Sequence, residues 1–345
     1  MKRTCKHDHN GKGGHSLKVG LDTICFSSWK LDPMGLLAKT IEYNLEGLQL
    51  GSHPFLERPS EYTDEFLAKL RANNLYVELG GAGVNPRDSG KSVEQMVEGW
   101  KSLFPLAAKM GAHCLNYCFG MLQERTMTNP TFAEQYELTI QVLKSLAPIA
   151  ADYQVYVTME LHLDLTYTEL ARMIEKVNSP WIRVSLDTAN AMGLMEDPVE
   201  AAKVLAPYAE TTHFKDTCVY LTDAGYNWQG GAPLGTGLVD LPKVTELLYK
   251  YNPDIHLNIE DAFGCLLIPC YDKAFLRSFP EQNAVRMMKF MQHLRRGAEM
   301  LAAGMHPHME DYKKYDVRMA MAARLWHSAE YARKLRDEIV GKAKS

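Results

Sequence analysis

Four residues able to bind a metal follow four short apolar runs between positions 155 and 260 of the 345-residue chain. Glu160, Asp187 and Glu260 each end a run rich in β-branched side chains, and His213 follows the run that begins at Glu210. Runs of this length and composition predict buried strands. Helix-like stretches separate them, so we expect parallel strands whose C-terminal ends bring the four side chains together.

Three carboxylates and one imidazole in a buried cluster predict a divalent metal site. Buried carboxylates repel one another, and a cation makes their proximity tolerable. An oxygen-rich donor set suits hard ions, so we expect one ion, with Mn²⁺ favoured and Mg²⁺ or Co²⁺ as alternatives. In the competing interpretation these side chains are helix caps or surface loop residues. That interpretation could hold for any one of the four residues, but it explains all four together less well.

The rest of the chain supplies the elements that must position this cluster. The predicted strands are 17–23, 45–50, 75–79, 112–118, 155–160, 182–187, 210–213 and 255–260. The predicted helices are 34–43, 62–73, 93–110, 132–153, 168–177, 198–206, 241–251 and 283–301, the last closing the eighth unit. Eight such pairs predict a (β/α)8 TIM barrel of the α/β class, whose active site lies at the C-terminal ends of the strands. A doubly wound sheet is the alternative, but no GxGxxG motif follows the first strand.

We divide the chain into a flexible basic arm (1–15), the barrel (16–303) and a C-terminal helical extension (304–345). The extension has amphipathic patterning, which fits either a lid on the outside of the barrel or a subunit interface. Two long loops, 220–238 and 263–280, follow the seventh and eighth strands, and long loops in compact domains are usually functional.

Composition excludes several classes of function. A net charge of -4 gives no electrostatic argument for nucleic-acid binding. No apolar stretch reaches the roughly 20 residues that span a bilayer, so we expect no membrane contact. The seven cysteines form no CxxC pair, and residues 1–15 have no apolar region typical of a secretory signal. These features favour a reduced, cytoplasmic protein.

Five short motifs resemble the xylose-isomerase-like TIM-barrel superfamily of sugar isomerases and epimerases. They are MELH at 159–162, SLDTAN at 185–190, THFKD at 212–216, NIED at 258–261, and PLGTGLVD at 233–240, which is similar to the P-x-G-x-G-x-x-D element of that superfamily. The resemblance extends over about residues 17–300. It implies that Glu160, Asp187, His213 and Glu260 bind one metal ion. It also implies that Glu160 and Glu260 exchange protons with a carbon beside a carbonyl group.

Two further residues are candidates for catalysis because each lies two positions after a metal ligand. His162 follows Glu160 and could act as a base or bind a sugar hydroxyl, whereas the alternative is that it orients the ligand. Lys215 follows His213 and could stabilise an oxyanion, whereas the alternative is a structural ion pair with Asp216.

Candidate substrate contacts lie at other strand ends and in the long loops. Each could equally be a core or surface residue. They are His53, His113, Asn116, Tyr117, Asn190, Trp228 and Phe263.

Three positions depart from the ketose 3-epimerases of the superfamily. Those enzymes carry Glu, His and Arg where this chain has Thr166, Asn190 and Val219. The departures favour a bulkier, oxidised substrate. They point to the catalytic subunits of C-glycoside deglycosidases, which act on 3-oxo-glycosides by proton abstraction and β-elimination with a small partner subunit.

We therefore predict a metal-dependent sugar lyase or isomerase/epimerase that acts on a small sugar or a glycoside. A homo-oligomer is expected, with or without a small partner subunit. Epimerisation or isomerisation of free sugars is one alternative. An apurinic-endonuclease-like phosphodiesterase is another, although a single His in the cluster and the negative net charge argue against it. A non-catalytic sugar-binding subunit is the third.

Overall fold

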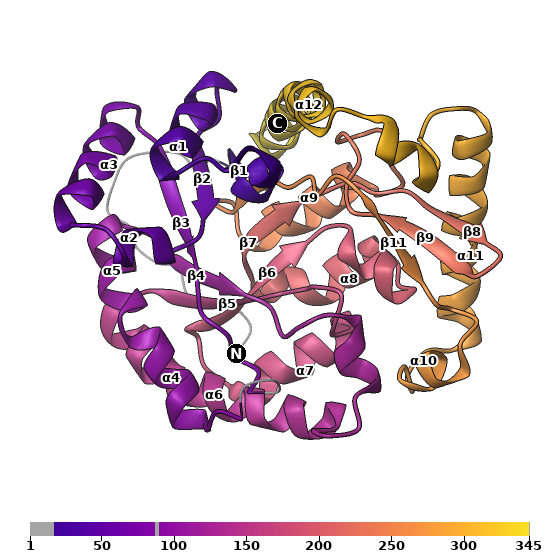
Figure 1. The fold of residues 1–345 in the computed structure, drawn as a ribbon, viewed down its shortest axis with the longest axis horizontal. Helices are drawn as coiled ribbons and strands as arrows, with labels where there is room; N and C mark the ends of the chain where they lie inside the picture. The colour runs from indigo at the N-terminus through magenta and orange to yellow at the C-terminus, as the bar shows by residue number, and fades with distance from the viewer. Residues whose placement is uncertain (1–16, 87–89, 345) are drawn as a thin grey trace.

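Eight parallel strands close into a barrel, in the order β1-β10-β7-β6-β5-β4-β3-β2, in the computed structural model of the chain (Figure 1). The structure describes residues 17–86 and 90–344, so the predicted arm at 1–15 lies outside the described residues. The barrel strands are β1 (Lys18–Asp22), β2 (Gly47–Leu50), β3 (Tyr76–Gly80), β4 (Cys114–Tyr117), β5 (Tyr156–Glu160), β6 (Ile182–Asp187), β7 (Ala209–Phe214) and β10 (His256–Ile259). The predicted TIM barrel is confirmed.

Helices cover the outside of the barrel between successive strands. They are α1 (Pro33–Glu42), α2 (His53–Leu56), α3 (Ser60–Ala72), α4 (Val93–Lys101), α5 (Leu103–Met110), α6 (Phe132–Tyr153), α7 (Tyr167–Val177), α8 (Pro198–Leu205) and α9 (Leu241–Tyr251). Short 3₁₀ helices lie in the loops: η1 (Thr23–Trp29), η2 (Leu122–Thr126), η3 (Asn190–Leu194), η4 (Ala206–Tyr208) and η5 (Met309–Lys314).

Local chemistry explains where several of these helices begin and end. Thr131 and Thr166 each form a capping box with the Glu three residues later, which starts α6 and α7. The single helix predicted over 93–110 is instead two helices that meet at Ser102. Pro105 explains the break, because it has no N–H to donate to the carbonyl group four residues earlier.

The two long loops form a second, smaller sheet beside the barrel. Its strands are β8 (Val219–Thr222), β9 (Gly225–Gln229) and β11 (Cys265–Ile268), antiparallel in the order β11-β9-β8. The short helix α10 (Lys273–Arg277) follows β11. Residues from two distant loops therefore share one sheet, which patterning within either loop could not indicate.

The predicted eighth helix, 283–301, is wrong as the closing element of the barrel. The helix forms as α11 (Ala284–Ala302) but packs against β8 of the small sheet. The barrel is closed instead by the long C-terminal helix α12 (Val317–Lys344), which packs against β1, β10 and α9 (Figure 1). Its buried side chains recur at helical spacing: Met321, Leu325, Ala329, Ala332, Leu335 and Ile339. Both helices are amphipathic, and spacing alone does not say which strand each one covers.

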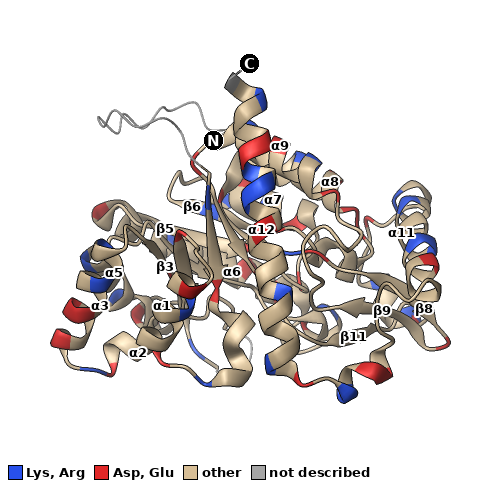
Figure 2. Ribbon diagram, turned by 90° about the horizontal axis from the view of Figure 1, so that it is seen from above, with Lys and Arg blue, Asp and Glu red and all other residues tan. Residues whose placement is uncertain are grey.

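Acidic and basic residues alternate along the outer helices in the view of Figure 2, and neither sign dominates that view. Among the described residues, no helix combines the length and the apolar character needed to cross a lipid bilayer. The six cysteines in the described part of the chain are free thiols.

Candidate metal centre

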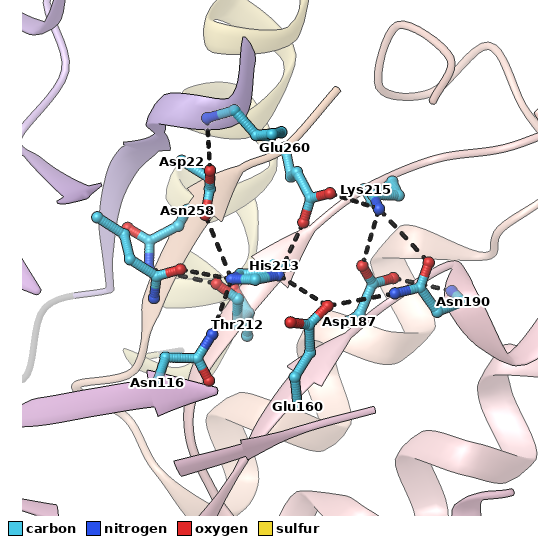
Figure 3. Close-up of polar contacts among 12 residues, drawn as sticks. Asp22, Asn116, Glu160, Asp187, Asn190, Thr212, His213, Lys215, Asn258 and Glu260 are labelled. Carbon is cyan, nitrogen blue, oxygen red and sulfur yellow. Dashed lines mark hydrogen bonds and ion pairs between the residues drawn. The ribbon is translucent and has the colours of Figure 1, made fainter. Parts of the chain in front are cut away.

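The four predicted metal ligands converge at the C-terminal ends of the barrel strands (Figure 3). Glu160 ends β5, Asp187 ends β6, His213 lies in β7 and Glu260 directly follows β10. One ligand atom from each lies within 4.8 Å of the others, and all four residues are buried. The register explains this, because His213 pairs with Asp187 on one side and with Asn258 on the other.

The ligand atoms fit a divalent cation. Asp187 Oδ2, His213 Nδ1 and Glu260 Oε2 are buried, and apart from ion-pair contacts within the cluster they have no hydrogen-bond partner. The Nδ1 atom lies 2.7 Å from Glu260 Oε2 and 3.1 Å from Glu160 Oε1. Buried polar atoms rarely lack a hydrogen bond, and these three face one another. Three carboxylates with one imidazole form a donor set suited to a hard divalent ion.

Hydrogen bonds from the η3 turn orient two of the ligands. Asp187 Oδ1 accepts backbone N–H groups from Ala189 at 2.7 Å and from Asn190 at 2.8 Å. The Asn190 side chain donates to Glu160 Oε1 at 3.3 Å and to the Leu161 carbonyl at 3.2 Å. Asn190, a predicted substrate contact, therefore orients a predicted metal ligand in this structure.

The cluster carries more negative charge than its own cations balance. Burial raises the pKa of Asp187 to about 6 and that of Asp22, which ends β1, to about 7. Burial alone would lower the pKa of His213, but the carboxylates of Glu160 and Glu260 raise it well above its usual value. A bound cation would relieve this excess of negative charge.

Lys215 lies inside the cluster. Its Nζ atom is 2.6 Å from Glu260 Oε1, 3.1 Å from Asp187 Oδ2 and 3.4 Å from Asn190 Oδ1. Burial opposes the charge, but Asp187 and Glu260 raise the pKa of Lys215 above its usual value. The alternative pair with Asp216 is not formed, because that carboxylate accepts backbone N–H groups from the loop at 235–239.

Three polar side chains crowd the other nitrogen of His213, Nε2. Asp22 Oδ2 lies 3.3 Å away, the Asn116 amide nitrogen lies 3.1 Å away, and Gln49 Oε1 is in close contact. Asn116 was predicted as a substrate contact but lies beneath the cluster. Sequence reasoning missed Asp22, although an acidic residue at the end of a predicted strand was the signal used for the other ligands. Gln49 lies inside β2 and carries no such signal.

His162 lies beside the cluster rather than in it. Its Nδ1 atom is 2.8 Å from the Gly120 carbonyl oxygen, so Nδ1–H donates to that carbonyl group. Together with Cys118 and Asp164 it forms a second group of potential ligand atoms. Next to this group, the loops after β3 and β4 line a cavity of about 330 Å³, and Tyr117, 39% exposed, is part of its wall.

The remaining predicted contacts lie farther from the four ligands. The ring of Trp228 is buried 5.5 Å from Lys215 Nζ, and Phe263 packs 4.8 Å from Tyr312. His53 is exposed at the start of α2.

The predicted placement of His113 at a C-terminal strand end is wrong. It precedes β4, and so lies at the N-terminal end of the barrel, 3.6 Å from Glu78.

A closed eight-stranded barrel with three buried carboxylates and one imidazole at its C-terminal rim defines a TIM-barrel protein with a candidate metal centre. The chain belongs to the xylose isomerase-like TIM barrel family, whose sequence profile matches residues 37–294. The predicted resemblance is thereby confirmed at the level of the superfamily, and the C-glycoside deglycosidase branch stays a prediction.

Individual relatives are distant. The chain is 22% identical over 139 residues to 3-oxo-isoapionate decarboxylase of Pectobacterium atrosepticum, which covers 39% of this chain and 50% of that enzyme. The fold of the present chain is similar to that of a D-tagatose 3-epimerase-like protein. The TM-score is 0.58, and the identity is 15% over 82% of this chain and 100% of the other. A xylose isomerase-like TIM barrel protein of Mycobacterium smegmatis in complex with magnesium gives a TM-score of 0.57 and 15% identity over 82% and 98%. At this identity the structural similarity shows the fold alone.

Proposed function

We propose that this protein is a divalent-metal-dependent enzyme that removes a proton from a carbon beside a carbonyl group of a sugar-derived substrate. The observation that carries the proposal is the buried cluster itself, in which Glu160 and Glu260 approach His213 Nδ1 from two sides (Figure 3). A divalent cation held by Glu160, Asp187, His213 and Glu260 would polarise the substrate carbonyl and stabilise the charge of the enolate.

In this proposal the two glutamates exchange protons with the substrate. Glu160 arrives from β5 and Glu260 from the loop after β10, so a substrate bound between them has one carboxylate on each face. One carboxylate takes the α-proton, and the other returns a proton to the opposite face, which inverts the carbon. Alternatively, the enolate expels a leaving group from the β-carbon, which is elimination.

Two neighbours support this chemistry. The Lys215 ammonium, shared between Asp187 and Glu260, adds a fixed positive charge beside the developing oxyanion. The Gly120 carbonyl accepts the proton of His162 Nδ1, which leaves Nε2 for a substrate hydroxyl or a leaving group. His162 and Lys215 are therefore our catalytic candidates beside the two glutamates.

Among the outcomes, we favour elimination on an oxidised, 3-oxo substrate. Support comes from Thr166, Asn190 and Val219, which replace the residues that grip free ketoses in 3-epimerases. Further support comes from the decarboxylase relative, whose name specifies a 3-oxo acid. Loss of CO2 beside a carbonyl group leaves the same kind of enolate that proton abstraction produces. Epimerisation of a free ketose is the second candidate, and the two-sided pair of carboxylates favours it.

Metal identity and assembly belong to the same proposal. We expect Mn²⁺, with Mg²⁺ or Co²⁺ as substitutes, and a homo-oligomer with or without a small partner subunit. The magnesium held by the related barrel protein supports a hard divalent ion. A phosphodiesterase would require several metal ions and more His ligands than the single His213 of this cluster.

Hydrogen exchange tests the proposal. The protein, loaded with Mn²⁺, is incubated in D₂O with a 3-oxo-glycoside or with a free ketose, and deuterium at the α-carbon is measured by mass spectrometry. We expect exchange with the metal and none after chelation. Glu160→Gln and Glu260→Gln should each lower the rate by at least about 100-fold. Glu246→Gln, in an exposed ion pair on α9, is the matched control and should exchange like the wild type.

Two results would contradict the proposal. The first is an absence of exchange with both substrate classes in a protein that carries its metal. The second is a metal content of about three ions per chain together with cleavage of phosphodiesters, which would assign the site to the competing class.

A further inference from the structure

A fully buried carboxylate, that of Glu78 on β3, lies inside the barrel below the metal centre. Its Oε2 atom accepts hydrogen bonds from Gln49 Nε2 at 3.0 Å, Thr211 Oγ1 at 2.7 Å and Asn258 Nδ2 at 2.9 Å. Its Oε1 atom accepts one from His256 Nδ1 at 2.5 Å. Partners from three strands, β2, β7 and β10, thus surround one anion on β3, and none of them is a ligand of the candidate metal centre.

Glu78 is ionised in the folded protein. Burial alone would raise its pKa, but the hydrogen bond from His256 and the charge of His113 lower the pKa to about 2. An ionised carboxylate can only accept hydrogen bonds. Every group that touches Glu78 must therefore present a donor to it.

This requirement fixes the orientation of the Gln49 amide. Because the amide nitrogen of Gln49 must face Glu78, the amide oxygen faces the Nε2 atom of His213. An oxygen accepts, so the Nε2 atom must carry a proton. With Nε2 committed to this proton, Nδ1 is the nitrogen that can give up its own proton and offer a lone pair to a metal ion, and it faces Glu160 and Glu260.

Of the other two neighbours of Nε2, Asp22 agrees with this assignment and Asn116 can be accommodated by turning its amide. Asp22 Oδ2, at 3.3 Å, also accepts from Nε2–H when the carboxyl group is ionised. The Asn116 amide nitrogen lies 3.1 Å from Nε2 and its amide oxygen accepts from the Thr158 hydroxyl, so a proton on Nε2 requires this amide to be turned. A hydroxyl group both donates and accepts, so Thr158 permits either orientation of that amide.

We propose that Glu78, acting through Gln49, is a positioning residue that holds His213 in the tautomer whose Nδ1 atom can bind a metal. The inference rests on the metal-dependent function proposed above and deepens it. Metal-binding histidines generally depend on the hydrogen bond made by their second nitrogen. Here that bond is itself directed by an anion two residues removed from the metal, at the centre of the barrel.

The variant Glu78→Gln tests whether Glu78 controls the tautomer of His213 through Gln49, and it keeps the shape of the side chain. An amide at position 78 can donate as well as accept, so the Gln49 amide is free to turn and present its nitrogen to His213. We expect the dissociation constant for Mg²⁺, measured by calorimetry, to rise about 10- to 100-fold. Gln49→Met, which leaves Glu78 in place, should weaken binding by a similar factor and serves as a second variant should Glu78→Gln fold poorly.

Nitrogen NMR of the histidine rings gives a readout that does not depend on activity. In the Mg²⁺-bound wild type, His213 should show a protonated Nε2 and an unprotonated Nδ1. Its signals are assigned by their loss in His213→Gln. In Glu78→Gln at the same metal concentration, the signals should move towards the other tautomer.

Two further variants separate positioning from stability. The exchanged pair Gln49→Glu/Glu78→Gln again places an acceptor opposite His213 Nε2 and a donor at position 78. It should restore Mg²⁺ affinity to within about threefold of the wild type, well inside the 10- to 100-fold loss expected of the single variant. Thr211→Val removes another hydrogen bond of the same carboxylate but leaves the Gln49 amide oriented, and should likewise bind within about threefold of the wild type.

The possible failures are distinguishable. If the wild type binds Mg²⁺ and Glu78→Gln binds it equally well, the inference is overturned and the proposed function stands. If Thr211→Val weakens binding as much as Glu78→Gln, the carboxylate acts only on stability, and the inference is again overturned. If the wild type binds no divalent metal, the inference and the proposed function fall together.

Discussion

The ion pair between Arg324 on α12 and Asp261 tests whether α12 is an integral part of the barrel. Arg324 Nε lies 2.7 Å from Asp261 Oδ2, and Nη2 lies 2.7 Å from Oδ1. The Nη2 atom also donates to the Gly231 carbonyl at 2.8 Å. The side chains are 14% and 2% exposed, so water screens this pair little. Because Asp261 directly follows Glu260, the contact also anchors the loop that carries a candidate metal ligand.

The expected cost of breaking this pair follows from its geometry. Arg324→Met removes three charge-assisted hydrogen bonds, two to Asp261 and one to the Gly231 carbonyl, and leaves the Asp261 carboxylate buried without this cation. Each such bond contributes about 1.5–3 kcal/mol, and breaking a buried pair by removing one partner costs about 3–5 kcal/mol. We therefore expect the free energy of unfolding, from urea denaturation at pH 7, to fall by about 3 kcal/mol or more.

Two controls accompany this measurement. Arg324→Met/Asp261→Asn removes both charges and should recover part of the loss, which yields the coupling energy of the pair. Arg318→Met changes an exposed residue of the same helix whose guanidinium donates to the Ser28 carbonyl, and should cost less than about 0.5 kcal/mol. If Arg324→Met lowers the free energy of unfolding by less than about 1 kcal/mol, α12 is not an integral part of the barrel. A small loss of this size is what an exposed ion pair on a detached lid would give.

Two further predictions concern other parts of the fold. Burial raises the pKa of Glu196 to about 8 from an ordinary 4.5, so the folded state keeps a proton that the unfolded state releases, and stability falls as pH rises through this range. The difference in the free energy of unfolding between Glu196→Gln and the wild type, measured by urea denaturation, should therefore grow in favour of the variant by about 2–3 kcal/mol from pH 5.5 to pH 8. A difference that does not change with pH would contradict the raised pKa of Glu196. A Cβ at Gly297 would lie 1.8 Å from the Val219 carbonyl oxygen, so Gly297→Ala should lower the melting temperature and destabilise the protein by about 1–3 kcal/mol as α11 separates from the small sheet. Gly341→Ala on α12, with no atom within 4 Å, is the matched control and should be neutral or stabilising, and equal effects of the two substitutions would contradict this packing.

Sequence alone could predict the barrel and the metal cluster because both depend on local order along the chain. Each of the eight strands is a short run with buried apolar residues, and each candidate ligand lies within one residue of the end of its strand. Parallel strands align their C-terminal ends, so Glu160, Asp187 and Glu260 must meet once the barrel closes. The same rule applied to the first strand would have predicted that Asp22 faces His213.

Only the tertiary structure decided which distant groups meet. Either of two amphipathic helices could cover the barrel as its eighth helix. In the folded chain α12 packs against β1 and β10, whereas α11 packs against the small sheet. Lys215 bonds with Asp187 and Glu260 rather than with its neighbour Asp216, since the loop at 235–239 already satisfies Asp216. The chain from Glu78 through Gln49 to His213 joins three strands, and it exists only where the closed barrel brings their inward-facing side chains within hydrogen-bonding distance. Local pattern therefore specifies the elements and the ligand set, whereas the closed packing selects the partners that orient them.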